Sequence, residues 1–147
     1  MRHNLFSQDS NTLGFHRFYT LHELIRTDAG FIDIDQITRD KTIVEKIKKD
    51  KLRWHGGTKA RLGWQLIQNC EIAQNNLSNI TIPLLVLQGE KDKLVVPAGA
   101  KMIVENASST DKEYKEYPDA MHQLLAELDD VKIDAKNTIF EWIKQRI

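Results

Sequence analysis

Hydrophobic and polar positions divide the chain into three stretches of different character. Residues 1–38 mix polar residues with a weak amphipathic run at 15–25, which predicts a short helix ending at 28–30 and then a loop. No chemistry is evident in this stretch, and its role is open. Residues 39–80 have strong helical periodicity, whereas residues 81–147 alternate apolar runs with amphipathic segments.

The stretch at 39–80 predicts two helices of a lid-like segment. Asp40 is placed to cap the first helix, in which apolar positions recur between solvated lysines. Gly56 and Gly57 then break the chain, and Thr58 supplies a cap for the second helix. Steps of three and four residues give the second helix one apolar face, typical of a core stripe. The members of this face are Leu62, Leu66, Cys70, Ala73 and Leu77.

The stretch at 81–147 predicts strand, helix, strand and helix. Residues 82–87 form a near-continuous apolar run, as in a parallel strand buried on both faces. Pro97 opens the next helix, because proline is tolerated in a first helical turn, and residues 112–117 predict the second strand. The final helix has an apolar stripe made of Val131, Ala135, Ile139, Trp142 and Ile143.

This alternation predicts an α/β fold with a parallel sheet and right-handed crossovers. Two strands cannot form a stable parallel sheet alone, because both faces and both edges need cover. The sequence therefore predicts the C-terminal part of a larger fold, with an incomplete sheet.

Composition narrows the class of protein without assigning a function. The chain has 21 Lys and Arg residues against 21 Asp and Glu, which gives no electrostatic reason to expect nucleic acid or an anionic membrane as the main partner. A single cysteine, Cys70, cannot form an internal disulfide and favours a reducing, cytoplasmic compartment. No apolar run follows the N-terminus, so we expect neither a signal peptide nor a membrane span.

Two chemically capable side chains follow the two predicted strands. Asp92 lies just beyond the first strand and His122 just beyond the second, at the carboxyl ends where α/β sheets gather their sites. An aspartate bonded to one imidazole nitrogen fixes the tautomer and leaves the other nitrogen free as a general base. No metal site or cofactor is expected, since the five histidines form no ligand spacing with Cys or carboxylates. These histidines are His3, His16, His22, His55 and His122.

The segments IPLLVLQGEKDKLV (82–95), KEYPDAMHQLLAE (115–127) and FEWI (140–143) resemble the C-terminal half of the monoacylglycerol lipase family of α/β-hydrolases. The segment DKLRWHGGTKAR (50–61) resembles the start of the family's lid, although Lys51 stands where proline is usual. The resemblance implies a serine hydrolase that cleaves a fatty acyl ester, such as a monoacylglycerol, with Asp92 and His122 in its catalytic triad.

The lid-like segment crowds apolar side chains at the start of its second helix, where the family's lid faces lipid. Such a patch suits peripheral membrane contact. The alternative is that the same side chains pack on the sheet below. The residues concerned are Leu62, Trp64, Leu66 and Ile67.

The chain has no recognisable nucleophile. A nucleophile elbow needs Gly-x-Ser-x-Gly, and no serine here has that setting. Cys70 lies on the apolar helix face, where packing is more usual than nucleophilic chemistry. The run beginning at His55 is similar to an oxyanion loop, but it lies within the lid-like segment and better fits a helix start.

We therefore expect a half-hydrolase that is inactive alone and that acts on a lipid ester when an N-terminal half completes it. The alternative is a non-catalytic interaction module that binds a partner through its open sheet edge. Docked structure in residues 1–38 would favour the module.

Overall fold

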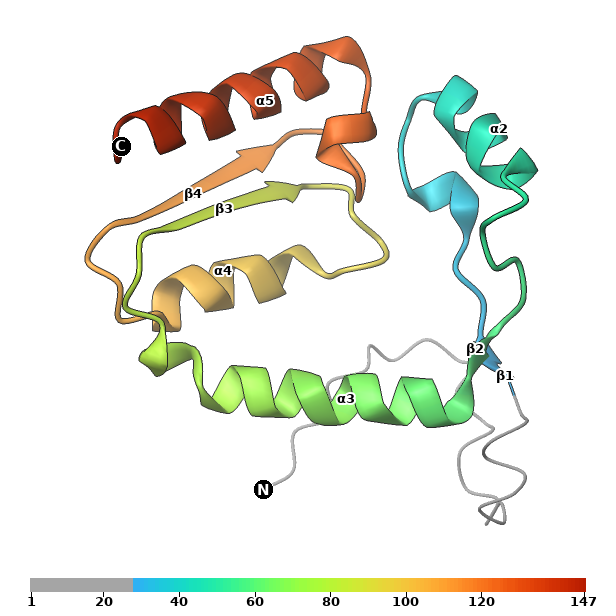
Figure 1. Ribbon diagram of the computed structural model, residues 1–147, viewed down its shortest axis with the longest axis horizontal. Helices are drawn as coiled ribbons and strands as arrows, with labels where there is room; N and C mark the ends of the chain where they lie inside the picture. Colours follow the sequence, from blue (N-terminus) through green and yellow to red (C-terminus); the bar gives the residue numbers. More distant parts are fainter. Residues whose placement is uncertain (1–27) are drawn as a thin grey trace.

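The computed structural model describes residues 28–147 (Figure 1). The helix predicted at 15–25 lies outside the described residues. With η denoting a 3-10 helix, the elements in chain order are β1 (Asp28–Gly30), η1 (Ile34–Gln36), α2 (Lys41–Lys49), β2 (Thr58–Lys59), α3 (Ala60–Asn75), η2 (Leu77–Asn79), β3 (Leu84–Gly89), α4 (Pro97–Asn106), β4 (Lys112–Tyr117), η3 (Leu124–Ala126) and α5 (Asp129–Lys144).

The strands β3 and β4 pair in parallel, in register from Leu84 with Lys112 to Gly89 with Tyr117. Both predicted strands are therefore present and parallel, within a sheet that has two strands in the described part of the chain. Two helices flank the pair in Figure 1, α4 below it and α5 above it. The α/β alternation follows the sequence prediction.

Side chains alternate between the two faces of this sheet, and each face meets one helix. On one face, Glu116 forms an ion pair with Lys101 of α4. On the other, Lys115 donates a hydrogen bond to Thr138 of α5. The hydrophobic core lies on the α5 side, with Leu87 packed against it, and consists of Tyr117, Ala120, Leu124, Val131 and Ala135.

The N-terminal part of the described chain confirms one predicted cap and corrects two expectations. Asp40 caps α2 by accepting a hydrogen bond from the backbone N–H of Thr42 at 2.8 Å. Residues 28–30, expected to end a helical run, instead form β1, which pairs antiparallel with β2. Thr58 therefore belongs to β2 and does not cap α3, whose N-cap residue is Lys59.

The prediction of a core stripe on α3 is wrong, because none of the residues of this helix is buried. Cys70, expected to be packed, is exposed, and Leu77, which is buried, belongs to the following η2. In the described chain, α3 contacts β1 and β2 at its start and η2 at its end, so no layer covers its apolar face. No described helix is both long and apolar enough to span a membrane.

Gly89 allows the end of β3 to approach the loop after β4. A Cβ atom at this position would lie 2.2 Å from the carbonyl oxygen of Met121 and 2.5 Å from that of Ala120. Both contacts involve backbone, which cannot turn aside as a side chain can. The two loops can therefore meet only because residue 89 lacks a side chain.

We predict that Gly89→Ala lowers the free energy of unfolding by about 1–3 kcal/mol, because the methyl group must push the two loops apart. The measurement is the urea unfolding midpoint, followed by circular dichroism. Gly99→Ala is the matched control, since a Cβ at Gly99 in α4 meets nothing within 4 Å. That variant should be neutral or more stable by up to about 1 kcal/mol, as expected inside a helix. Equal losses in both variants would contradict the close-approach explanation.

Candidate active site

Asp92 is held in a fixed orientation in the turn that follows β3. One carboxylate oxygen, Oδ1, accepts hydrogen bonds from the backbone N–H groups of Leu94 (2.8 Å) and Val95 (2.9 Å). The other, Oδ2, accepts from His122 Nδ1 at 2.9 Å and from Gln88 Nε2 at 3.2 Å. Burial raises the pKa of Asp92, but the four hydrogen bonds outweigh it and hold the pKa below its usual value. The carboxylate is therefore ionised at neutral pH.

Gln88 is a site residue that the sequence analysis missed. It is buried at the end of β3, where its amide also donates to the carbonyl oxygen of Gly89 at 3.0 Å. The available signal was a polar residue closing an otherwise apolar strand, a position where a buried amide needs partners. Gln88 thereby fixes the Asp92 oxygen that faces the imidazole.

His122 lies on the loop after β4, and this loop is bonded directly to the Asp92 turn. The backbone N–H of Glu90 donates to the carbonyl of Tyr117 at 3.0 Å, and that of Lys91 donates to Ala120 at 2.9 Å. The reversal uses Asp119 at φ 59°, in the left-handed region. Adjacent strands therefore bring Asp92 and His122 together, as the sequence analysis expected.

The imidazole of His122 has one bonded and one available nitrogen. Its side chain is 35% exposed, and Nδ1 makes the bond to Asp92. Among the described residues no hydrogen bond reaches Nε2. An Asp-bound Nδ1 carries the hydrogen, so Nε2 is left as the acceptor for an incoming proton.

Glu127 supports the His122 loop, a role that its place in the quoted segment 115–127 did not indicate. Its side chain is 0% exposed and accepts from the backbone N–H groups of Met121 (2.9 Å) and Arg39 (3.1 Å). Arg39 Nε donates to it at 2.8 Å and the backbone N–H of Leu128 at 3.2 Å. Burial raises the pKa of Glu127, but these bonds together hold it below the usual value.

The segment before α2 packs against the same loop. Ile37 and Thr38 are buried; the carbonyl of Ile37 accepts from the backbone N–H of Gln123 at 2.9 Å, and the Thr38 hydroxyl donates to the carbonyl of Ala126 at 2.8 Å. Residues 37–39 are thus part of the support of the histidine, although the sequence analysis gave residues 1–38 no role.

A hollow of about 640 Å³ borders His122 on the α5 side of β3. Apart from His122 and Gln123 its lining is apolar, and it includes Leu85 and Leu87 of β3 and Ile139 of α5. In the described chain β3 pairs only with β4, so its other edge is unpaired. This site can orient and exchange a proton, but the described chain provides no nucleophile bonded to His122.

The remaining candidate residues lie away from the Asp92–His122 pair. His55 is exposed in the turn before β2, where its Nε2 is 2.7 Å from the carbonyl oxygen of Asp50, so it forms part of that turn. Cys70 stands on the exposed side of α3. The predicted lid residues Leu62, Trp64, Leu66 and Ile67 are all exposed.

Comparison with known proteins places these features in a family. A family model described as serine aminopeptidase, S33, matches residues 13–129, which extends the relationship upstream of residue 40. The chain is 34% identical to the rat monoglyceride lipase over 80% of its length and 36% identical to the human one, also over 80%. It spans 39% of the length of each of these relatives.

Solved structures show the same fold. The monoacylglycerol lipase of Paleococcus ferrophilus superposes with a TM-score of 0.70 at 24% identity, covering 76% of this chain and 42% of that one. A soluble variant of the Saccharomyces cerevisiae monoglyceride lipase, in complex with a substrate analogue, superposes with a TM-score of 0.67 at 24% identity. It covers 82% of this chain and 44% of its own. The observed strands and helices are therefore part of an α/β-hydrolase fold.

We predict that Gln88→Leu raises the pKa of Asp92, because the ionised carboxylate loses a hydrogen-bond donor that the protonated form needs less. The measurement is an NMR titration of the Asp92 carboxyl carbon. Gln145→Leu is the control, as Gln145 is exposed at the end of α5. An unchanged Asp92 pKa in Gln88→Leu would show that Gln88 fills space without holding the carboxylate.

We predict that Glu127→Gln lowers the free energy of unfolding by about 3 kcal/mol at neutral pH, because it leaves Arg39 and the His122 loop without their buried charge. The folded pKa of Glu127 is below its unfolded value, so this contribution is complete above the unfolded pKa of about 4.5 and is lost as the pH falls through the folded pKa. Urea unfolding at pH 7 and at pH 3 measures both effects.

Glu141→Gln is the control for this experiment. Glu141 is exposed and its ion pair with Lys144 is long, at 3.9 Å, so the change should cost less than about 0.5 kcal/mol at either pH. A difference between wild type and Glu127→Gln that stays constant from pH 7 to pH 3 would contradict a stabilising role for the ionised carboxylate.

Proposed function

The chain belongs to the serine aminopeptidase S33 family of α/β-hydrolases, and from this premise we propose that it supplies the acid and the base of a carboxylic-ester hydrolase acting on monoacylglycerols. The observation that carries the proposal is the 2.9 Å hydrogen bond between Asp92 and His122 at the carboxyl ends of two adjacent parallel strands. The substrate class follows from the names of the relatives, which are monoglyceride lipases.

In the proposed mechanism His122 transfers the proton, and Asp92 orients the imidazole of His122. Asp92 accepts the Nδ1–H bond, so Nε2 can take the proton from a serine hydroxyl as that oxygen attacks the ester carbonyl. The imidazolium then returns the proton to the departing alcohol, and a water molecule later repeats the cycle to release the fatty acid. The lowered pKa of Asp92 supports this role, because an ionised carboxylate stabilises the transient imidazolium.

The nucleophilic serine is proposed to come from an N-terminal half that is not in this chain. Supporting this, β3 has an unpaired edge in the described structure, and the apolar hollow beside this strand is bordered by His122. Strands added at that edge would cover Leu85 and Leu87 and would place their own carboxyl ends beside the histidine.

We also propose that the exposed apolar face of α3 serves as the lid and contacts lipid at a cytoplasmic membrane surface. Leu62, Trp64 and Leu66 are each more than half exposed, and Ile67 is also exposed. A cluster of large apolar side chains in water suits reversible insertion among lipid headgroups.

The second candidate is a non-catalytic module that binds a partner through the open edge of β3. Ile37 and Thr38 are buried against the His122 loop, and docking of the N-terminal stretch is what a standalone module requires. However, the family model already includes these residues, so the same packing is expected of the hydrolase fold. The hydrolase remains the better supported proposal.

The test is hydrolysis of a long-chain monoacylglycerol by the purified chain, alone and mixed with the N-terminal half of a related lipase that carries Gly-x-Ser-x-Gly. We expect turnover only in the mixture. His122→Ala should lower it by about 10⁶-fold, as expected for loss of the histidine of a triad. Gln145→Ala, which changes an exposed residue after α5 and away from the site, should leave it unchanged.

Two results would contradict the half-hydrolase. Turnover by the chain alone, blocked by a serine-directed phosphonate, would mean that this chain holds its own nucleophile. A folded complex of the two halves, detected by co-purification and circular dichroism but without turnover, would favour the non-catalytic module.

A further inference from the structure

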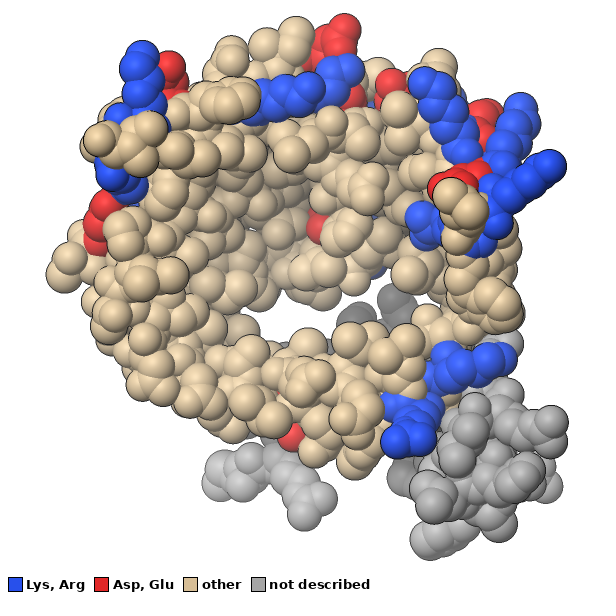
Figure 2. Space-filling view, in the orientation of Figure 1, with Lys and Arg blue, Asp and Glu red and all other residues tan. Residues whose placement is uncertain are grey.

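The balanced charge of the whole chain conceals an uneven distribution. Residues 41–61 hold eight Lys and Arg residues but only two acidic ones, Glu45 and Asp50. Figure 2 shows Lys and Arg side chains clustered over α2 and over the start of α3, at the right of the view, in addition to those over α5. The expectation that an anionic surface has no electrostatic attraction for this chain holds for the total charge and fails for this region.

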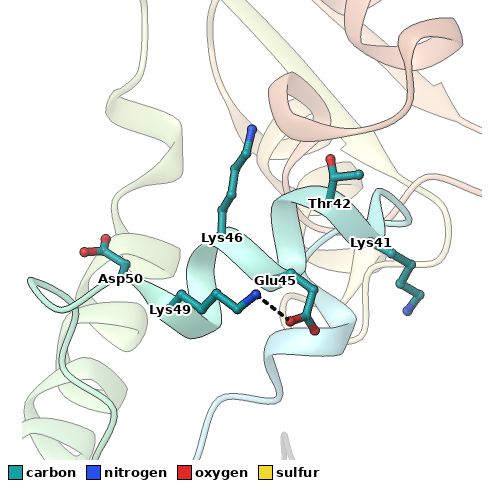
Figure 3. A pocket seen from close by; sticks show the side chains of 6 residues that line it. All are labelled: Lys41, Thr42, Glu45, Lys46, Lys49 and Asp50. Carbon is teal, nitrogen blue, oxygen red and sulfur yellow. Dashed lines mark ion pairs between the residues drawn. The ribbon is translucent and has the colours of Figure 1, made fainter.

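The helix α2 has apolar side chains on its inner side and basic side chains on its outer side. Val44 is buried on its inner side, whereas Lys46 and Lys49 project outward around a shallow hollow of about 690 Å³ (Figure 3). Some of the basic charge is neutralised, since Lys49 lies 3.8 Å from Glu45 and Lys48 lies 2.9 Å from Asp35.

Four basic side chains of the region form no ion pair within the described part of the chain. We call Lys46, Lys51, Arg53 and Arg61 the basic belt. Uncompensated charges of one sign disfavour burial under another protein layer, because each loses its hydration without gaining a partner. A binding partner for this surface must therefore be hydrated and negatively charged.

An exposed tryptophan is held in place within the same region. Trp54 is 71% exposed, and its Nε1 donates to the carbonyl oxygen of Gly57 at 3.2 Å. The ring lies so close to Gly56 that a Cβ atom there would be 2.2 Å from it, and Lys59 Nζ is 6.0 Å from the ring centroid. Leu52, two residues earlier, is 98% exposed.

Trp54 and Leu52 lie among basic side chains, so this surface favours contact both with an apolar phase and with anions. Tryptophan favours the boundary between apolar and aqueous phases, and lysine and arginine extend toward headgroup anions. The surface of an anionic bilayer offers both, whereas a nucleic acid offers the anions without an apolar phase for Leu52.

We propose that α2 and the turn at 50–61 form a docking surface for anionic lipid bilayers. Trp54 and Leu52 enter the interface, while the basic belt binds the phosphate and carboxylate groups of the lipids. This deepens the membrane contact proposed above by adding selectivity for lipid charge, and it is measured without ester turnover, so it can succeed or fail independently of hydrolysis.

The test is flotation of the purified chain with two kinds of vesicle, phosphatidylcholine alone and phosphatidylcholine with 30% phosphatidylserine. We expect tighter binding to the anionic vesicles at 0.1 M salt and loss of that preference at 1 M salt, where the screening length falls from about 10 to about 3 Å. The double variant Lys46→Gln, Arg61→Gln should weaken binding to anionic vesicles about 25-fold, at about fivefold per charge.

The matched control removes two exposed lysines of α5, by Lys136→Gln and Lys144→Gln, and should leave vesicle binding unchanged. Trp54→Ala should weaken binding to both kinds of vesicle, because it removes apolar insertion. Circular dichroism establishes that each variant is folded.

Three outcomes would overturn the proposal. They are equal affinity for neutral and anionic vesicles, an equal loss in the α5 control, and tighter binding to a single-stranded oligonucleotide with no effect of Trp54→Ala. The last result would assign the surface to nucleic acid.

Discussion

The geometry around the histidine depends on one buried charge, the carboxylate of Glu127. With 0% of its side chain exposed, this group has exchanged water for four protein donors. Those donors come from three places: Arg39 before α2, Met121 in the histidine loop, and Leu128 at the start of α5. A buried charge tolerates little rearrangement, since each lost donor leaves it partly unsolvated. The loop that carries His122 is therefore held by hydrogen bonds to the Glu127 carboxylate as much as by packing.

The same principle of a satisfied buried carboxylate is repeated at Asp92, on the other side of the loop. Glu127 bonds the residue immediately before His122, and Asp92 bonds the imidazole itself. Between the two lies the contact of Gly89 with the backbone of Ala120, which sets how closely the loops approach. Two carboxylates and one missing side chain thus define the position of the imidazole, which leaves Nε2 as its available nitrogen.

The proximity of Asp92 and His122 was predictable from the sequence, because strand order and loop position follow from local patterns. The apolar run before Asp92, and the rule that parallel strands end at one edge, were sufficient to bring Asp92 and His122 together. The roles of Arg39 and Glu127 were not predictable, because their pairing spans 88 residues and neither lies in a periodic pattern. Helical periodicity likewise predicted the helix α3 but wrongly implied a buried stripe, because periodicity cannot say whether another layer covers an apolar face.

The described chain therefore contains two regions that differ in how far their polar and apolar side chains find partners within the chain. From β3 onward, charged and polar groups near the site are paired internally, and the core lies between the sheet and α5. From α2 to α3, apolar side chains remain exposed among hydrated basic ones, and exposure of the apolar ones is unfavourable unless something outside the described residues covers them. The basic belt forms no ion pair with Asp92 or Glu127, so substitutions there leave the hydrogen bonds that hold Asp92 and His122 intact. The proposed lipid binding and the proposed proton transfer are thus carried by separate parts of this fold, the first by the lid-like segment and the second by the ends of β3 and β4.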